Sequence, residues 1–536
     1  MSGDLVIIGA RVRTLDPARP WASAVAIADG TVVAVGADDE VRAAAAAGSE
    51  LVDGRGMAIV PGLTDSHSHP FLGALETRGA DLAGAASVEQ VRERLAAERR
   101  RCGGGEWITG HSLEYRVFDG VEVSGELFAE AVGGNPALLT FFDFHTGVAT
   151  PAALSLAGVD GARSLEGAGE VVCRADGLPT GELRESAIEL VAVAMPEPTR
   201  EQRLDLIAAA LADMNRVGLT ASHMMDGTLE TPDECRTLEA GGRLTVRQVV
   251  PFTAHPSMND DEVGAAIAAG AQAGRLWRSG WAKLFIDGVV EPGTAWLEQP
   301  DTAGRGMVPN WPDPDRYARV IARFAAAGFP SITHAIGDRG VRCALDAYRA
   351  AGQVARGPHR VEHIETMQDD QLPRFAAEGV VASQQAIHLQ WMNPDHSDPW
   401  SRALGDERSR HGFRTAELRR SGAVLALGSD WPVAGYDPRE GMAWARLRRR
   451  PGDSDAEAYN PEQRLTALEA LEGYTTQAAL AVADGEVAGR VAPGFRGDLT
   501  CFAADPVECD ADELPQLPVL MTVVDGRAVW RADDAG

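Results

Sequence analysis

Residues 60–69 read VPGLTDSHSH, an apolar strand entered through Pro61-Gly62 that ends in two histidines separated by one residue. Side chains alternate along an extended strand, so we expect His67 and His69 to lie on the same side of it. Two neutral imidazoles that converge in this way are typical ligands of zinc and similar borderline metals. Paired histidines also occur on exposed strands, so this stretch alone leaves both interpretations open.

Seven further apolar strand candidates follow along the chain, and most of them precede a helical pattern. The segments 204–214, 315–327 and 341–350 carry apolar residues at the spacing of a helix that packs on one face. Strands that alternate with helices form parallel βα units, and eight of them indicate an α/β fold, a closed (β/α)8 TIM-like barrel. The predicted strands are 58–64, 219–224, 244–252, 281–286, 330–334, 360–363, 379–383 and 424–428.

Strand patterns also fill both ends of the chain, with Asp525-Gly526 as a predicted hairpin turn. Neither end has enough strand to bury a core alone. We therefore predict one small β-sandwich domain formed by residues 1–60 together with 485–536. The strand patterns are 5–8, 25–27, 31–35 and 51–52 at the start, and 499–502, 520–524 and 528–530 at the end.

The gap between the first two barrel strands is far longer than a normal βα connection. It contains a helical pattern at 88–101 and a strand pattern at 137–142. We predict that residues 72–200 form a subdomain inserted after barrel strand 1, over the active-site mouth. The barrel itself then comprises residues 61–71 and 201–484.

Lys283 is the only lysine among 50 basic residues. Arginine stays protonated at any working pH, whereas a lysine amine can lose its proton and react. Lys283 lies inside an apolar strand, where an unpaired ammonium is costly and burial lowers the pKa. The free amine could react with carbon dioxide to form a carbamate, which is an anion able to bridge two metal ions. A Schiff-base lysine and a lysine paired with an acid remain alternatives.

Three further residues stand where a barrel displays its catalytic groups. His334 and His363 each end a predicted strand, and Asp430 follows the eighth. A carboxylate in that place can bind a metal and accept a proton from metal-bound water. Each of the three could instead be structural, and it is their order along successive strands that favours a site.

Charge and cysteine content restrict the partners. The formal net charge of −28 disfavours nucleic acid and anionic membranes, which both need a basic face. No apolar run reaches the ~18 residues of a membrane span. The start of the chain does not resemble a signal peptide, and its six cysteines form no CxxC pair. We therefore expect a cytoplasmic protein with a small-molecule substrate, and a homodimer remains open.

Taken together, these motifs resemble the amidohydrolase superfamily, and more closely the family 3 branch that contains N-substituted formamide deformylase. The resemblance covers nearly the whole chain. Its motifs are Val60–His69, Lys283–Gly288, His334–Arg339, Glu362-His363, Gly428–Pro432 and Gly494–Leu499.

The resemblance implies a binuclear metal centre. His67 and His69 would bind one ion, His334 and His363 the other, and carboxylated Lys283 would bridge them. Asp430 would bind the first ion and act as general base. A hydroxide held between the ions would attack the carbonyl carbon of an amide or N-substituted formamide, so that a non-peptide C–N bond breaks. Zinc is the first expectation for both divalent ions.

The sequence departs from the family where substrate should bind. Related chains often carry Asp-Gly-His in the inserted segment, and here it is Asp143-Phe144-His145. The small-residue stretch that usually follows the lysine is replaced by 288–293, which introduces Glu291. Our candidates for contact with substrate are His145, Asp338, Arg339, Trp391 and Trp431.

Three alternatives remain open. A mononuclear deaminase-like hydrolase would keep the four histidines and Asp430 but leave Lys283 unmodified. A non-hydrolytic lyase or isomerase could use the same metals on an activated carbonyl. A binding protein without catalytic activity would keep the fold, although such proteins usually lack one or more of the metal ligands.

Overall fold

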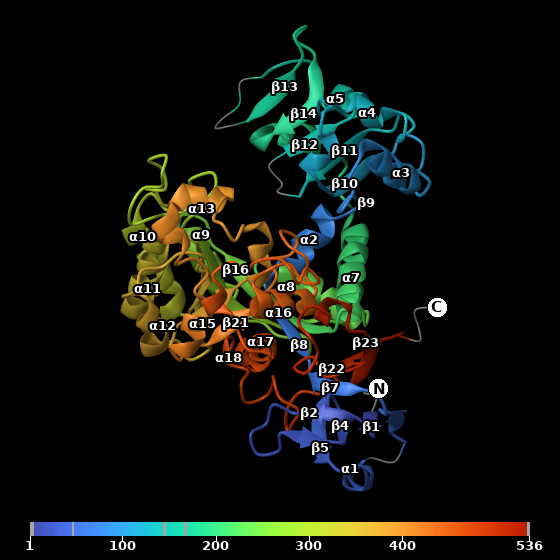
Figure 1. Ribbon diagram of the computed structural model, residues 1–536, viewed down its shortest axis with the longest axis vertical. Coiled ribbons are helices and arrows are strands. Elements are labelled where there is room, and N and C mark those ends of the chain that lie inside the picture. Colours follow the sequence, from blue (N-terminus) through green and yellow to red (C-terminus); the bar gives the residue numbers. More distant parts are fainter. Residues whose placement is uncertain (1–4, 46–47, 143–145, 164, 166–168, 533–536) are drawn as a thin grey trace. The chain divides into compact units, whose positions relative to one another are not determined.

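The computed structural model describes residues 5–45, 48–142, 146–163, 165 and 169–532. The chain divides into two compact units, each described here by itself. The barrel unit comprises Met1–Pro70 and Ala208–Gly536, and the inserted unit comprises Phe71–Ile207 (Figure 1).

The barrel unit is built on a sheet of eight parallel strands. From one edge to the other the order is β21, β20, β19, β18, β17, β16, β15 and β8, so every neighbour in space is a neighbour along the barrel sequence. The ring closes after β21, where Asp430 donates a backbone hydrogen bond to His67 and His69 donates one to Trp431. The strands are β8 (Leu63–Ser68), β15 (Leu219–Met224), β16 (Arg247–Thr253), β17 (Trp277–Phe285), β18 (Ser331–Ala335), β19 (Arg360–His363), β20 (Val381–Gln384) and β21 (Leu425–Leu427).

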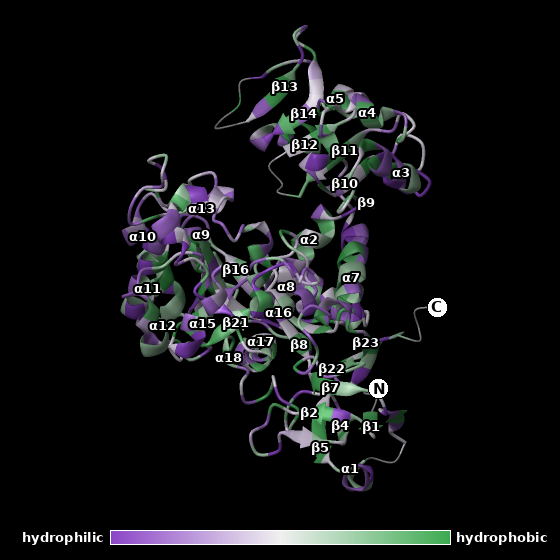
Figure 2. Cartoon of the chain, in the orientation of Figure 1, coloured by the Kyte–Doolittle hydropathy of each residue, from purple (hydrophilic) through white to green (hydrophobic). Residues whose placement is uncertain are grey.

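Helices connect these strands, as the (β/α)8 pattern predicts. On α10 the buried residues Tyr317, Val320, Ile321 and Phe324 recur every three or four positions, which places them on one face of the helix. In Figure 2 the outer helices α10 and α11 carry much of the hydrophilic colour. The connecting helices are α8 (Thr231–Ala240), α9 (Asp260–Ala268), α10 (Pro314–Ala326), α11 (Asp338–Ala351), α12 (Leu372–Glu378), α13 (Pro399–Leu404), α14 (Asp406–Ser409), α15 (Thr415–Arg420), α16 (Pro438–Leu447), α17 (Ala467–Gly473) and α18 (Thr476–Leu480).

The prediction of a single strand over 58–64 was wrong. The segment forms two strands, β7 (Ala58–Pro61) in a sheet outside the barrel and β8 inside it. Gly62 lies between them, and a Cβ there would approach Thr220 Oγ1 to 2.3 Å, so the chain passes too close to β15 for a side chain. Because the barrel strand starts at Leu63, His67 lies inside it and His69 directly after it.

Both ends of the chain contribute to a β-sandwich. A six-stranded sheet has the order β24, β23, β22, β7, β2 and β3, and a four-stranded sheet has the order β5, β4, β1 and β6. Residues of both sheets, including Ile7, Ile27, Ile59 and Val523, share one buried core. The strands are β1 (Leu5–Ile8), β2 (Arg11–Arg13), β3 (Trp21–Ala22), β4 (Ala24–Ala28), β5 (Thr31–Gly36), β6 (Glu50–Asp53), β22 (Leu499–Phe502), β23 (Val519–Val524) and β24 (Arg527–Arg531), with α1 at Asp38–Ala44. The predicted fold class is thus confirmed.

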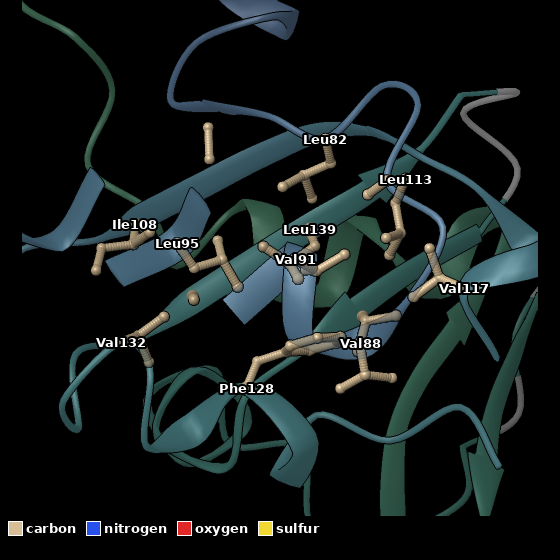
Figure 3. Packing of buried hydrophobic residues seen from close by; sticks show 14 of the residues in the cluster. Leu82, Val88, Val91, Leu95, Ile108, Leu113, Val117, Phe128, Val132 and Leu139 are labelled. Atoms are coloured by element: carbon tan, nitrogen blue, oxygen red, sulfur yellow. The ribbon is translucent and has the colours of Figure 1, made fainter. Parts of the chain in front are cut away.

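The inserted unit has its own sheet and core. The sheet order is β13, β14, β12, β11, β10 and β9, and Val88, Val91 and Leu95 of α3 pack against it (Figure 3). Its coverage of the active-site mouth stays a prediction. The strands are β9 (Ala80–Asp81), β10 (Ile108–Leu113), β11 (Ala137–Phe141), β12 (Thr146–Ala149), β13 (Glu170–Cys173) and β14 (Pro179–Arg184). The helices are α3 (Val88–Arg99), α4 (Glu126–Ala129), α5 (Pro151–Leu156) and α6 (Glu189–Ala192), while α2 (Pro70–Glu76) and α7 (Arg200–Arg216) cross between the units.

Among the described residues, none of the helices has the length and apolar character that a bilayer crossing requires.

Candidate metal centre

The six predicted ligands come from the carboxyl ends of five barrel strands. Lys283, His334 and His363 lie near the ends of β17, β18 and β19, and His67 lies late in β8. His69 directly follows β8, and Asp430 lies three residues after the end of β21. The carboxyl ends of parallel strands meet at one face of a barrel, which is where such folds place their active sites.

Asp430 links the two histidines of the first motif. Its Oδ1 lies 3.2 Å from Nε2 of His67 and 3.2 Å from Nε2 of His69. The rings of His67 and His363 have centroids 4.6 Å apart, and those of His334 and His363 are 4.4 Å apart. One donor atom each from His67, His363 and Asp430 lie within 4.8 Å of one another, close enough to hold one metal ion.

Burial determines the charge of these side chains. It lowers the pKa of His363 well below its usual range, and neighbouring His334 and His67 lower it further. Burial, with the charge of Lys283, lowers the pKa of His334 to about 3. Burial alone would raise the pKa of Asp430, but His67 and His69 hold it well below the usual range. At neutral pH His334 and His363 are therefore neutral imidazoles and Asp430 is a carboxylate, which are the forms that bind metal.

Lys283 is fully buried, and its Nζ has no hydrogen-bond partner among the described residues. Burial lowers its pKa to about 8, although Glu362 and Asp430 oppose that shift. The Nζ lies 4.7 Å from the centre of the Phe285 ring. An unpaired buried amine is costly and exceptional in a native protein, so it requires a functional explanation.

The nitrogen and oxygen donors fit a metal centre. Nδ1 of His69 and Nδ1 of His363 are buried and, like Lys283 Nζ, have no hydrogen-bond partner within the described ranges. His363 and Asp430 also have φ angles of 72° and 63°, a left-handed conformation that is rare outside glycine. Such conformations cost about 1–3 kcal/mol and cluster at functional sites.

The sequence matches the amidohydrolase family over residues 50–530. The chain belongs to this family. It is therefore a hydrolase. It is 28% identical over 98% of its length to N-substituted formamide deformylase of Arthrobacter pascens, covering 97% of that protein. It is 26% identical over 98% of its length to protein LONG AFTER FAR-RED 3 of Arabidopsis thaliana, covering 91% of that protein.

Among solved structures, an uncharacterized metal-dependent hydrolase from Pyrococcus horikoshii OT3 superposes with a TM-score of 0.76 at 23% identity. The match covers 95% of this chain and 99% of that one. At 23% identity, this structural similarity shows that the two chains share a fold.

This amidohydrolase also contains a buried network of hydrogen-bonded polar side chains that the sequence did not predict. Glu362 Oε2 lies 2.7 Å from Nδ1 of His67, and Arg360 Nε donates to Oε1 of Glu362 at 2.9 Å. Arg360 further donates to Nδ1 of His223 at 2.9 Å. Glu362 and Arg360 are fully buried, and Arg360 with His67 holds the pKa of Glu362 far below its usual value. The available signal was a pair of opposite charges, Arg360 and Glu362, spaced by two within a predicted barrel strand.

A buried carboxylate organises the loop that follows β17. Asp287 accepts backbone hydrogen bonds from Trp296, Ile336 and Gly337 at 2.8–3.1 Å. Burial raises its pKa to about 7 despite these bonds. Its Oδ1 lies 3.8 Å from Nε2 of His334, so Asp287 ties this loop to a proposed ligand.

Two of the residues predicted to contact substrate, Trp431 and Trp391, lie near Asp430. Trp431 is adjacent to Asp430 and is mostly buried. Trp391 lies 5.0 Å, between ring centroids, from His388, whose Nε2 is 3.8 Å from Asp430 Oδ2. His388 was not predicted, because no motif in the sequence marks it.

Asp338 and Arg339 begin α11 and are engaged with nearby groups. Asp338 accepts hydrogen bonds from Glu298 N and Gln368 Nε2, and Arg339 pairs with Glu298 at 3.4 Å. His145 lies outside the described residues.

Proposed function

We propose that this amidohydrolase is metal-dependent and cleaves a non-peptide C–N bond, in an amide or an N-substituted formamide. The observation that carries the proposal is the convergence of His67, His363 and Asp430, together with Lys283 of β17, which is buried and has no hydrogen-bond partner among the described residues. The likeness to N-substituted formamide deformylase along 98% of the chain supports the bond type.

In this proposal His67, His69 and Asp430 would hold one divalent ion, and His334 and His363 would hold a second. Zinc suits this donor set first, though nitrogen and oxygen ligands also accept manganese, iron or cobalt. The neutral Lys283 amine could add to carbon dioxide, with formation of a C–N bond and loss of a proton, and the resulting carbamate would supply anionic oxygen ligands to the metals. Bound metals would polarise the substrate carbonyl and lower the pKa of water from 15.7 to about 7.

The protein's own groups orient the reaction and move the proton. The Asp430 carboxylate stays ionised at neutral pH and takes a proton from the attacking water. It then delivers that proton to the departing amine nitrogen. The C–N bond breaks, a C–O bond forms, and the products are a carboxylic acid and an amine. Glu362 orients the imidazole of His67 by accepting a hydrogen bond from its Nδ1–H.

A mononuclear hydrolase is the second candidate. It is favoured by one observation: within the described part of the chain, His67, His363 and Asp430 form the only group of three potential ligands that is tight enough for one ion. In that case Lys283 would remain unmodified.

The test combines metal content with product analysis. Purified protein loaded with zinc is assayed against amides, formamides, cyclic imides and lactones, with detection of both acid and amine. We expect about two ions per chain, lost in His67→Ala and His334→Ala, and matched release of acid and amine. Full activity with at most one ion would reject the binuclear form. An isomerised or eliminated product without hydrolysis would reject the bond type.

A further inference from the structure

A cavity lies at the amino ends of the barrel strands, whereas the candidate metal centre lies at their carboxyl ends. Its volume is about 130 Å³, and its walls come from the starts of β8, β15, β16 and β17 and from residues 479–498. Five arginines line it, namely Arg247, Arg275, Arg278, Arg490 and Arg496. In a chain with a net charge of −28, this concentration of positive charge is a local feature.

Two of the five guanidinium groups are neutralised by their own carboxylates. Arg247 pairs with Asp498 at 2.5 Å and with Asp525 at 3.0 Å. Arg275 pairs with Asp525 and with Asp29. These ion pairs join the barrel to the β-sandwich, so Arg247 and Arg275 have a structural role on this side of the cavity.

The other side carries more cations than anions. Arg278 and Arg496 share one oxygen, Oδ2 of Asp484, at 2.8 and 2.9 Å. Arg490 forms no ion pair with any described residue. Three guanidinium groups therefore face one carboxylate. Burial lowers the pKa of Arg278, Asp484 opposes that shift, and the charges of Arg496 and Arg356 add to it.

The walls also present N–H donors. Nδ1 of His223 accepts from Arg360, since a guanidinium only donates, so the imidazole proton is assigned to Nε2. Trp277 is 4% exposed, and its buried Nε1–H has no hydrogen-bond partner in the described structure. A donor buried without an acceptor is unfavourable, and an anion bound close to it would supply one.

We propose that this cavity is a binding site for a small, multiply charged oxyanion of the phosphate or sulfate type. Over the whole cluster five guanidinium groups face four carboxylates, and the excess of positive charge lies on the side of Arg278, Arg490 and Arg496. That side suits an anion, and arginine forks suit tetrahedral oxyanions. A water molecule needs about 10–15 Å³ of cavity space. The cavity therefore has room for one oxyanion with some water, but it is smaller than the ~300–1,000 Å³ of sites for larger ligands. The ligand is thus a free ion rather than the phosphate group of a nucleotide.

Isothermal titration calorimetry of the full, metal-loaded chain with inorganic phosphate and with sulfate tests the site. Ionic strength is held constant with chloride. The diagnostic variant is Arg490→Gln, which removes a charge without breaking an ion pair. Arg410→Gln is the matched control, because Arg410 is exposed, lies outside the cavity and has no ion pair in the described chain. Asp430→Asn is included because phosphate could also bind at the metal centre.

We expect both anions to bind, with affinity about tenfold or more weaker in Arg490→Gln and unchanged in Arg410→Gln and Asp430→Asn. The absence of binding to the unmodified chain would overturn the proposal. Equal weakening in both arginine variants would show only a general charge effect. Loss in Asp430→Asn with full binding in Arg490→Gln would assign the anion to the metal centre and also overturn it.

Discussion

Burial decides which chemistry is open to the amine of Lys283. Because its pKa falls to about 8, an appreciable share is neutral near physiological pH, whereas an ordinary lysine is almost wholly charged. An arginine at the same place would remain a cation. The one lysine of the chain thus occupies a position where its ability to lose a proton matters.

Lys283→Arg should therefore fail as badly as Lys283→Ala. We expect each to lose activity and to weaken metal binding by at least the 10–100-fold that changes around ligands typically cost. Bicarbonate or a short carboxylic acid should partly rescue the alanine variant but not the arginine variant. Intact-mass measurement under gentle conditions should show the added carboxylate in the unmodified protein. Arg410→Lys is the matched control, and an active Lys283→Arg enzyme would end the carbamate hypothesis.

Asp430→Asn should separate metal binding from proton transfer. The amide can still coordinate weakly but cannot accept a proton, and that role contributes roughly 10²–10⁴-fold to rate. We expect a folded protein that keeps much of its metal and loses activity by that factor. Turnover near that of the unmodified enzyme would remove Asp430 from the base role.

Glu362→Gln should act on the metal through His67. The glutamate accepts from Nδ1 of His67 and is itself held by Arg360, so the change loosens a ligand without removing it. We expect metal affinity to fall about 10–100-fold, measured by competition with a chelator. Excess metal should restore most activity, which a directly catalytic role would not allow.

At the scale of elements, β19 shows why some of the site was predictable and some was not. The order of the eight strands and the position of His363 at the end of one of them follow from the alternation of strand and helix patterns along the chain. Arg360 and Glu362 lie in the same strand, but their partners His67 and His223 are remote in sequence. No linear spacing reveals which charged side chains meet inside a barrel. The division at Gly62 was missed for a similar reason, since close approach to Thr220 is a three-dimensional constraint.

The connection into β19 contains a histidine that makes stability depend on pH. His359 accepts from the backbone N–H of Ser331 at 2.9 Å, and its other ring nitrogen lies 3.1 Å from Gly352 O. Burial lowers its pKa in the folded state. Below about pH 6.5 the unfolded chain binds a proton at this histidine that the folded chain does not. The free energy of unfolding therefore decreases as the pH is lowered, by up to about 1.4 kcal/mol per pH unit.

Thermal melting of His359→Gln should show this. We expect the variant to be less stable at pH 8 but to lose less stability than the unmodified protein between pH 6.5 and 5. His411→Gln changes an exposed histidine and serves as control. Parallel curves for His359→Gln and the unmodified protein would contradict the assignment.

At the scale of the whole molecule, the two ends of the chain depend on each other. β7 pairs with β22, and Arg247 of the barrel is held between Asp498 and Asp525. A chain that ends before Gly485 loses β22–β24, which leaves β7 paired with β2 on one edge only and exposes the core face around Ile59. We expect a marked fall in melting temperature or insoluble protein. Unchanged thermal stability of that truncated chain would show that the two ends fold independently.

The pairing of β7 with β22 has a consequence for synthesis on the ribosome. Val60 faces Thr500, so the partner strand emerges 440 residues later. At ~5–20 residues per second, that interval is on the order of 20–90 s. Throughout it the nascent chain presents an unpaired β edge and an uncovered apolar face, which are the features that chaperones bind and that seed aggregation. Expression yield of this protein should therefore respond to chaperone supply during elongation more than to conditions after release.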